Sequence, residues 1–176
     1  PILMQLFDEI RHAHSRISSE ILQTPLLYSN WLSAHCDGDV YLKLESEQVT
    51  GSFKARGSLN KLKWMQEQQI GKRPVTASTG NHGLGFARAC HLLGIEGTVY
   101  LPHNAVASKV ESIRSYNVKL QFHGNDPYTT EMHARKTAEE NGWLYVSPYN
   151  DPQIIAGQGT TGIEVLDQFS NPDNIL

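Results

Sequence analysis

The sequence of 176 residues has few of the features that would take it out of the soluble globular class. Its two cysteines, Cys36 and Cys90, lie far apart and form no C-x-x-C pair, so we expect free thiols and no disulfide framework. No apolar run approaches the roughly 18–20 residues that cross a bilayer. The N-terminal residues also lack the basic segment of a signal peptide. We therefore expect a cytoplasmic protein with no membrane partner.

The sequence has no excess of charge of either sign. Lys and Arg number 15 against 18 Asp and Glu, so a formal charge of −3 gives no electrostatic reason to expect a nucleic-acid partner. The eight histidines show no H-E-x-x-H spacing and form no ligand grouping, so we expect no metal site. A hydrophobic content of 39% is typical of a globular chain that forms one large domain or two small ones.

From Gly71 onward, short apolar segments alternate regularly with amphipathic ones. The predicted strands are residues 74–78, 98–101, 119–122 and 143–146, and the predicted helices between them are 81–93, 108–116 and 128–141. This alternation predicts right-handed βαβ units and a parallel sheet. Single elements are expected on either side: helices at 6–17, 29–35, 54–69 and 152–169, and a strand at 40–44.

The fold class is therefore α/β. We expect a small α/β domain at residues 73–150, inserted into a larger domain whose pieces are residues 1–72 and 151–176.

One stretch with residues that could take part in catalysis follows the predicted strand at 40–44. Thr50 and Ser52 are good helix N-cap residues and Gly51 permits a tight bend, so Lys54 is expected in the first helical turn. The positive end of the helix dipole pushes the amine towards neutrality, which Schiff-base chemistry requires. For an isolated lysine, an ordinary surface position is the commoner explanation. Gly57, inside the expected helix, indicates a packing or site constraint.

A second stretch lies where the strand at 74–78 meets the next helix. Ser78 and Thr79 supply hydroxyls, Gly80 lets an anion approach the backbone, and the first amides of a helix beginning near Asn81 are free donors. An amino-acid carboxylate would fit such a site, although an ordinary helix cap with glycines for close packing explains the residues equally well. The glycine spacing, G-x-x-G-x-G, does not match the dinucleotide fingerprint.

Both stretches resemble motifs of the serine/threonine dehydratase and serine racemase family. The run Lys-Leu-Glu-Ser-Glu-Gln-Val-Thr-Gly-Ser-Phe-Lys-Ala-Arg-Gly, residues 43–57, is similar to the family's cofactor-lysine motif. The resemblance implies that Lys54 binds pyridoxal 5'-phosphate and that Phe53 packs against the cofactor ring.

The run Ser-Thr-Gly-Asn-His, residues 78–82, is similar to the family's carboxylate loop. The resemblance implies that the substrate carboxylate binds to Ser78, Thr79, Gly80, Asn81 and His82, and that Asn81 also contacts the cofactor ring oxygen. A third match is the run Ala-Gly-Gln-Gly-Thr at 156–160. Thr79 stands where racemase-like members carry serine, so two-base racemisation is an alternative, with a helix-capping hydroxyl as the simpler explanation.

The resemblance implies the tryptophan-synthase-β-like, fold-type II architecture and an amino-acid substrate. The implied activity is a dehydratase that converts serine- or threonine-type hydroxy amino acids to 2-oxo acids and ammonia, in an intact enzyme that is a homodimer. Alternatives are a serine racemase, a β-replacement synthase and a non-catalytic carboxylate- or partner-binding α/β module. The family's phosphate-binding glycine run is absent, so we expect an N-terminal portion that is inactive alone.

Overall fold

A computed structural model describes residues 2–176, with side chains described from residue 4 onward. Its larger sheet has four parallel strands in the order β5-β4-β3-β6. The strands are β3 (Pro74–Ala77), β4 (Thr98–Leu101), β5 (Lys119–Phe122) and β6 (Leu144–Tyr145). The predicted α/β fold with a parallel sheet is confirmed.

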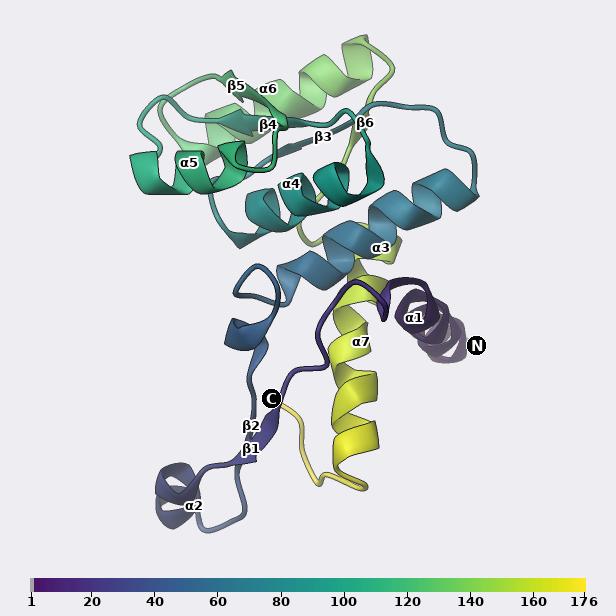
Figure 1. Ribbon diagram of the computed structural model, residues 1–176, viewed down its shortest axis with the longest axis vertical. Helices are drawn as coiled ribbons and strands as arrows, with labels where there is room; N and C mark the ends of the chain where they lie inside the picture. Colours follow the sequence, from purple (N-terminus) through teal and green to yellow (C-terminus); the bar gives the residue numbers. More distant parts are fainter. Residues whose placement is uncertain (1) are drawn as a thin grey trace.

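Helices cover both faces of this sheet (Figure 1). Helices α4 (Asn81–Leu93) and α5 (Ala107–Arg114) lie on one face, and α6 (Pro127–Glu140) lies on the other. Successive residues of β4 point to opposite faces: Val99 and Leu101 pack in the same core cluster as α4, whereas Tyr100 packs with α6. Because both faces are covered at the centre of the sheet, every residue of β4 is buried, whereas the edge strand β5 alternates polar and apolar residues.

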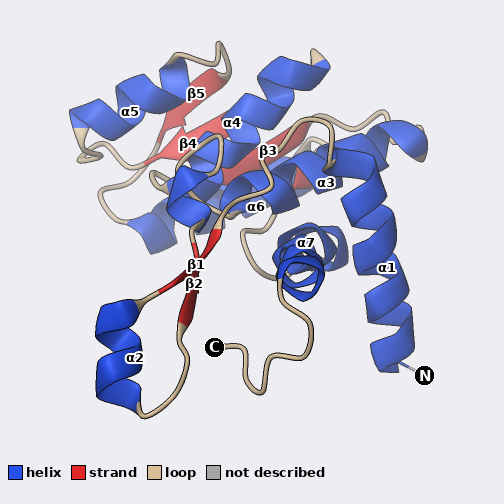
Figure 2. Cartoon of the chain, turned by 60° about the horizontal axis from the view of Figure 1, so that its bottom comes forward, coloured by secondary structure: helices blue, strands red, loops and turns tan. Residues whose placement is uncertain are grey.

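Three further helices, α1 (Ile2–Ile17), α3 (Lys54–Glu67) and α7 (Pro152–Gln168), stack beside the sheet layers. Helix α3 packs against α4 on one side and α7 on the other, and α1 packs against α7 (Figure 2). A Cβ atom at Gly57 would lie 2.9 Å from the Ile154 carbonyl oxygen, and one at Gly157 would lie 2.7 Å from the Gly57 Cα. The packing constraint predicted at Gly57 is therefore confirmed: it is the close crossing of α3 and α7.

An arm projects from this body (Figures 1 and 2). Strands β1 (Leu26–Tyr28) and β2 (Tyr41–Lys43) pair antiparallel and carry the short helix α2 (Asn30–Cys36) between them. Ser29 caps α2 as predicted, accepting a hydrogen bond from the Leu32 N–H. Strand β1 was not predicted, since three residues are too few for a periodicity and the strand exists through its pairing with β2.

The start of α3 differs in detail from the prediction. Neither Thr50 nor Ser52 is its N-cap; that position is Phe53, which is itself in a helical conformation and makes no side-chain cap bond. The turn before it uses Gly51 at φ 70°, and the Ser52 Oγ accepts a hydrogen bond from the Lys54 N–H at 3.1 Å. Lys54 nevertheless begins the helix, so the predicted first-turn position is confirmed.

Both cysteines are free, with Cys36 exposed and Cys90 buried. Over residues 2–176, no helix has the length and apolar character needed to span a bilayer. In the same described part of the chain, no group of three or more His, Cys, Asp or Glu side chains could hold a metal ion. The expected domain boundaries fall in the loops before β3 and before α7, and the division into domains stays a prediction.

Candidate active site

The topology of the sheet defines where a ligand site is expected. The chain runs outward from β3 to β4 and β5 and then returns to place β6 on the other side of β3. The carboxyl ends of β3 and β6 therefore flank the point at which the strand order reverses, and open α/β sheets bind ligands at such a point. The loops that leave these two ends contain Ser78 and Pro148.

Lys54 points to the carboxyl ends of β3 and β6 from the first turn of α3, and we call the space between these ends, Lys54 and the first turn of α4 the crevice. Its Nζ donates a hydrogen bond to the Pro148 carbonyl oxygen at 2.9 Å, and it lies 4.9 Å from the centroid of the Phe53 ring. The Lys54 side chain is half-buried, and burial lowers the pKa of its amine. The helix N-terminus disfavours the ammonium form as well, so both effects favour a neutral, nucleophilic amine. Phe53 is 40% exposed beside it.

The start of α4 forms the opposite wall. Gly80 is the N-cap of the helix, and its N–H donates to the Ser78 Oγ at 3.2 Å. A Cβ at Gly80 would meet no atom within 4 Å, so the space beside its backbone is open. The first amides of α4 have no intrahelical acceptor and point towards this space. The N-cap of α4 is Gly80 and not Thr79, and the role of the Thr79 hydroxyl stays a prediction.

His82 contributes differently from its neighbours in the loop. Its ring is 4% exposed, with Nε2 3.1 Å from the Thr76 Oγ1 and 3.3 Å from the Val146 carbonyl oxygen. Burial lowers the pKa of His82 to about 4, with a further lowering from Lys54 and an opposing effect of the Val146 carbonyl. The neutral ring therefore links the ends of β3 and β6, and the backbone of His82 is what remains to face an anion.

Close packing of α3 on α4 brings Lys54 and the start of α4 to opposite sides of the same crevice. A Cβ at Gly85 would lie 3.0 Å from the Lys54 carbonyl oxygen, so the two helices touch near their first turns. The structure thus brings Lys54 and Phe53 to the same end of the sheet as the loop at residues 78–82. The roles of these residues in binding stay predictions.

Other residues of the recognised runs lie elsewhere. Arg56, Glu45 and Thr160 are joined in a buried polar network away from the Lys54 amine. The network includes Glu164, which the sequence analysis did not identify. The sequence alone could have shown that Arg56 faces away from Lys54, since residues two apart on a helix point to opposite sides. Glu164 stands in no recognised motif, and only tertiary contacts reveal it.

Comparison with known proteins agrees with this geometry. The sequence profile of the family described as "Pyridoxal-phosphate dependent enzyme" matches residues 17–176. The chain is 37% identical over 169 residues to the catabolic L-threonine dehydratase of Escherichia coli K12, covering 96% of this chain and 51% of that protein. It is 39% identical to the same enzyme of Staphylococcus aureus N315, covering 96% of this chain and 49% of that one.

Among solved structures, the serine racemase of Dictyostelium discoideum superposes with a TM-score of 0.86 at 31% identity, covering 94% of this chain and 54% of that one. The chain spans about half the length of the curated relatives it matches. The profile match over nine-tenths of the sequence, together with a helix-initiating lysine at the switch point of a parallel sheet, shows that the chain belongs to the pyridoxal-phosphate-dependent enzyme family with the fold-type II architecture.

Proposed function

We propose that the protein containing this chain is a pyridoxal-phosphate-dependent ammonia-lyase that converts serine- or threonine-type hydroxy amino acids to 2-oxo acids and ammonia. The observation that carries the proposal is the Lys54 amine, half-buried in the first turn of α3 and directed to the carboxyl ends of β3 and β6. Similarity to threonine dehydratases supports the substrate class.

The residues of the crevice fit the cofactor in chemical character. Lys54 would hold it through Nζ, the exposed ring of Phe53 offers an apolar face beside that amine, and Asn81 offers an amide at the start of α4. When bound, pyridoxal phosphate supplies an electron sink that makes the substrate Cα proton acidic. The free amine of Lys54 would then take that proton as general base, a role for which its lowered pKa suits it.

The substrate carboxylate would be held at the start of α4. The hydroxyls of Ser78 and Thr79 and the first amides of α4, at Asn81 and His82, provide donors for a carboxylate in the open space beside Gly80, at the positive end of the helix. Holding the carboxylate fixes the substrate Cα relative to Lys54. The start of α4 would then bind the substrate, and Lys54 on the opposite side would transfer the proton.

Racemisation at the same site is a second candidate activity. Thr79 directly precedes the N-cap residue Gly80, and its hydroxyl is the group that we propose for a second proton transfer. Incubation of the intact enzyme with L-serine separates the two activities: a dehydratase releases pyruvate and ammonia, whereas a racemase accumulates D-serine. A carboxylate-binding module without catalysis would release neither.

The assignment of Lys54 has a direct chemical test. The protein is incubated with pyridoxal phosphate, reduced with borohydride and mapped by mass spectrometry. We expect the label on Lys54, and no specific label in the Lys54→Arg variant. Lys61→Arg, on the same helix, is the matched control and should label as the parent does. Specific labelling of a lysine other than Lys54 would refute the assignment.

The whole-protein properties belong to this proposal as well. The chain contains no run of three glycines to bind the cofactor phosphate, so we propose that it has no dehydratase activity alone. We also propose that the intact enzyme is a homodimer, which analytical ultracentrifugation of the complete protein would test.

A further inference from the structure

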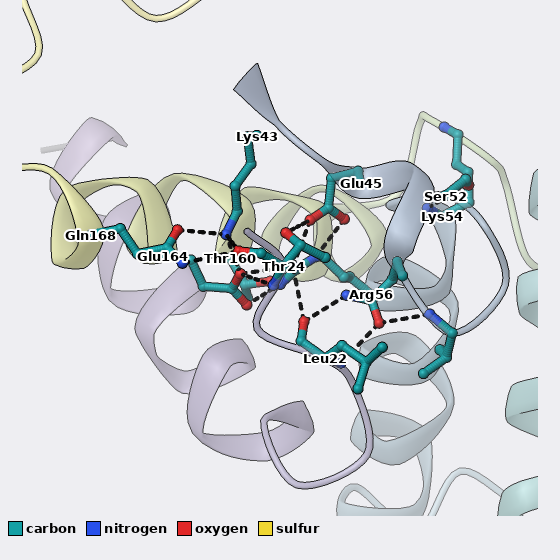
Figure 3. A network of polar contacts seen from close by, with 12 residues as sticks. Leu22, Thr24, Lys43, Glu45, Ser52, Lys54, Arg56, Thr160, Glu164 and Gln168 are labelled. Atoms are coloured by element: carbon teal, nitrogen blue, oxygen red, sulfur yellow. Dashed lines mark hydrogen bonds and ion pairs between the residues drawn. The ribbon is translucent and has the colours of Figure 1, made fainter. Parts of the chain in front are cut away.

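A buried cluster of polar side chains lies outside the candidate active site (Figure 3). We name it the Arg56 cluster, and its members are Thr24, Lys43, Glu45, Arg56, Thr160 and Glu164. It joins the segment before β1, the end of β2 with the 3-10 turn η1 (Glu45–Glu47), the first turn of α3, and α7. The Arg56 side chain at its centre is fully buried.

The Arg56 guanidinium donates hydrogen bonds to two carboxylates. Its Nε and Nη2 donate to the two oxygens of Glu45 at 2.8 and 2.7 Å. Its Nη1 and Nη2 donate to the two oxygens of Glu164 at 2.6 and 2.9 Å, and Nη1 also donates to the Thr160 Oγ1 at 3.2 Å. Because the guanidinium is a rigid plane with five N–H donors, these partners fix its orientation as well as its position.

The cluster also balances its own charge. Lys43 Nζ lies 2.6 Å from a Glu164 oxygen and donates to the Thr24 carbonyl oxygen at 2.7 Å, so two cations face two carboxylates. Burial by itself raises the pKa of Glu164, but the bonds from Arg56 and Lys43 outweigh burial and lower the pKa. The ion pairs therefore persist at neutral pH and hold Arg56 in one place.

Arg56 makes most of the polar side-chain contacts of the first turn of α3. Its N-cap residue, Phe53, makes no side-chain cap bond, and the nearest substitute is the bond from the Lys54 N–H to the Ser52 Oγ. The close approaches of Gly57 to Gly157 and of Gly85 to the Lys54 backbone are packing contacts, and the hydrogen bonds from Asn60 to Gln153 join α3 to α7 one turn further on. Arg56 is the residue of this turn that is bound from two directions.

The orientation of the turn decides where the Lys54 amine points. Residues two apart lie about 200° from each other around a helix, so Lys54 and Arg56 project to opposite sides. Figure 3 shows the Lys54 side chain directed away from the cluster. Rotating α3 by about 20° would move an amine roughly 8 Å from the helix axis by about 3 Å. That displacement is as large as the 2.9 Å hydrogen bond from Lys54 to the Pro148 carbonyl.

We propose that Arg56 is a positioning residue for Lys54: held between Glu45 and Glu164, it fixes the first turn of α3 and directs the Lys54 amine into the crevice. The catalytic meaning of this arrangement rests on the proposed function, whereas the effect on the amine itself does not. A displacement of about 1 Å is enough to lower catalysis about a hundredfold, so a positioning effect of this size matters.

Two variants test the proposal. Arg56→Lys keeps the charge and loses the two-pronged geometry. The double variant Arg56→Met with Glu45→Gln removes both ion pairs of Arg56, keeps the Lys43–Glu164 pair and leaves no buried charge unpaired, which favours folding. The control is Lys63→Met, which breaks the 2.7 Å ion pair with Glu20 further along α3. Circular dichroism and urea unfolding confirm that each variant is folded.

The readout is competitive acetylation of the chain with acetic anhydride across a range of pH, with each lysine followed by mass spectrometry. In both Arg56 variants we expect the Lys54 profile to move towards that of an ordinary exposed lysine. Its acetylation at about pH 8 should fall about threefold or more, because less of the amine is neutral there. The lysines outside the Arg56 cluster, and Lys54 in the Lys63→Met control, should keep the parent profile.

Folded Arg56 variants with an unchanged Lys54 profile would overturn the proposal and leave Arg56 a purely structural residue. A change of equal size in the Lys63→Met control would also overturn it, since general loosening of α3 would then explain the result. The borohydride mapping described above is a separate arm. Specific labelling away from Lys54 there would refute the proposed function and leave the acetylation result standing.

Discussion

Replacing Gly157 with alanine is expected to destabilise the protein, although the same change usually stabilises a helix. An added Cβ would lie 2.7 Å from the Arg56 carbonyl oxygen, 2.7 Å from the Asn60 Cβ and 2.7 Å from the Gly57 Cα. Two of these three atoms belong to the backbone of α3, so the clash cannot be relieved by a side-chain rotation alone. Helices α3 and α7 would have to separate.

The magnitude follows from two opposing effects. Alanine in place of glycine in a helix interior stabilises by about 0.8–1.0 kcal/mol. Overpacking a close contact of this kind costs about 1–3 kcal/mol, and more when backbone must move. We therefore expect Gly157→Ala to lower the free energy of unfolding by about 1–2 kcal/mol, because separating the helices also loosens the packing of Asn60 and its neighbours.

Gly162 on the same helix provides the matched control. A Cβ at Gly162 would meet no atom within 4 Å, so Gly162→Ala should gain only the helix propensity and stabilise by about 0.5–1 kcal/mol. Urea unfolding followed by circular dichroism measures both variants, and with a slope of about 2 kcal/mol/M the midpoints should differ by about 1 M. Equal midpoints, or a more stable Gly157→Ala, would refute the close crossing of α3 and α7.

The remaining predictions concern pH, a helix cap and the cofactor. His82 has a folded-state pKa of about 4 against 6.5 unfolded, so the unfolded chain binds more protons between these values. The free energy of unfolding should therefore fall by about 3 kcal/mol as the pH drops from 6.5 to 4. Urea titrations of His82→Asn should show little of this fall. Glu164 has a lowered pKa, so its contribution to the free energy of unfolding is present above the unfolded pKa of 4.5 and is lost as the pH falls through its folded pKa. Glu164→Gln should flatten the dependence of stability on pH in that range. Asp151 caps α7 through the Gln153 and Ile154 N–H groups and pairs with Lys61 at 2.7 Å, so Asp151→Ala should cost about 2–4 kcal/mol and Asp151→Asn, which keeps the cap, clearly less. The isolated chain should bind pyridoxal phosphate weakly: losing two phosphate bonds of about 1.5–3 kcal/mol each costs about a hundredfold or more in affinity, and stoichiometric binding seen in a visible-absorbance titration would contradict this.

Much of the candidate site could be predicted from local sequence. The alternation of apolar segments and helices from Gly71 predicts the parallel sheet, because both faces of such a sheet are buried and each crossover needs a helix. Lys54 at the start of α3 follows from the turn at Gly51, although the predicted capping residues Thr50 and Ser52 are not the N-cap, and Gly80 before α4 follows from the preference for glycine where a strand meets a helix. These features are local, and short segments determine them.

What only the tertiary structure decided depends on contacts between distant segments. His82 lies in the loop expected to bind a carboxylate, yet its ring is buried against Thr76 and Val146, because the ends of β3 and β6 meet there. Glu164 stands in no motif and is nevertheless the partner of Arg56, 108 residues away in sequence. Sequence periodicity shows which side of a helix is buried, but the residue that neutralises a buried charge depends on how the helices cross, and that is settled only when α3, α7 and β2 pack together.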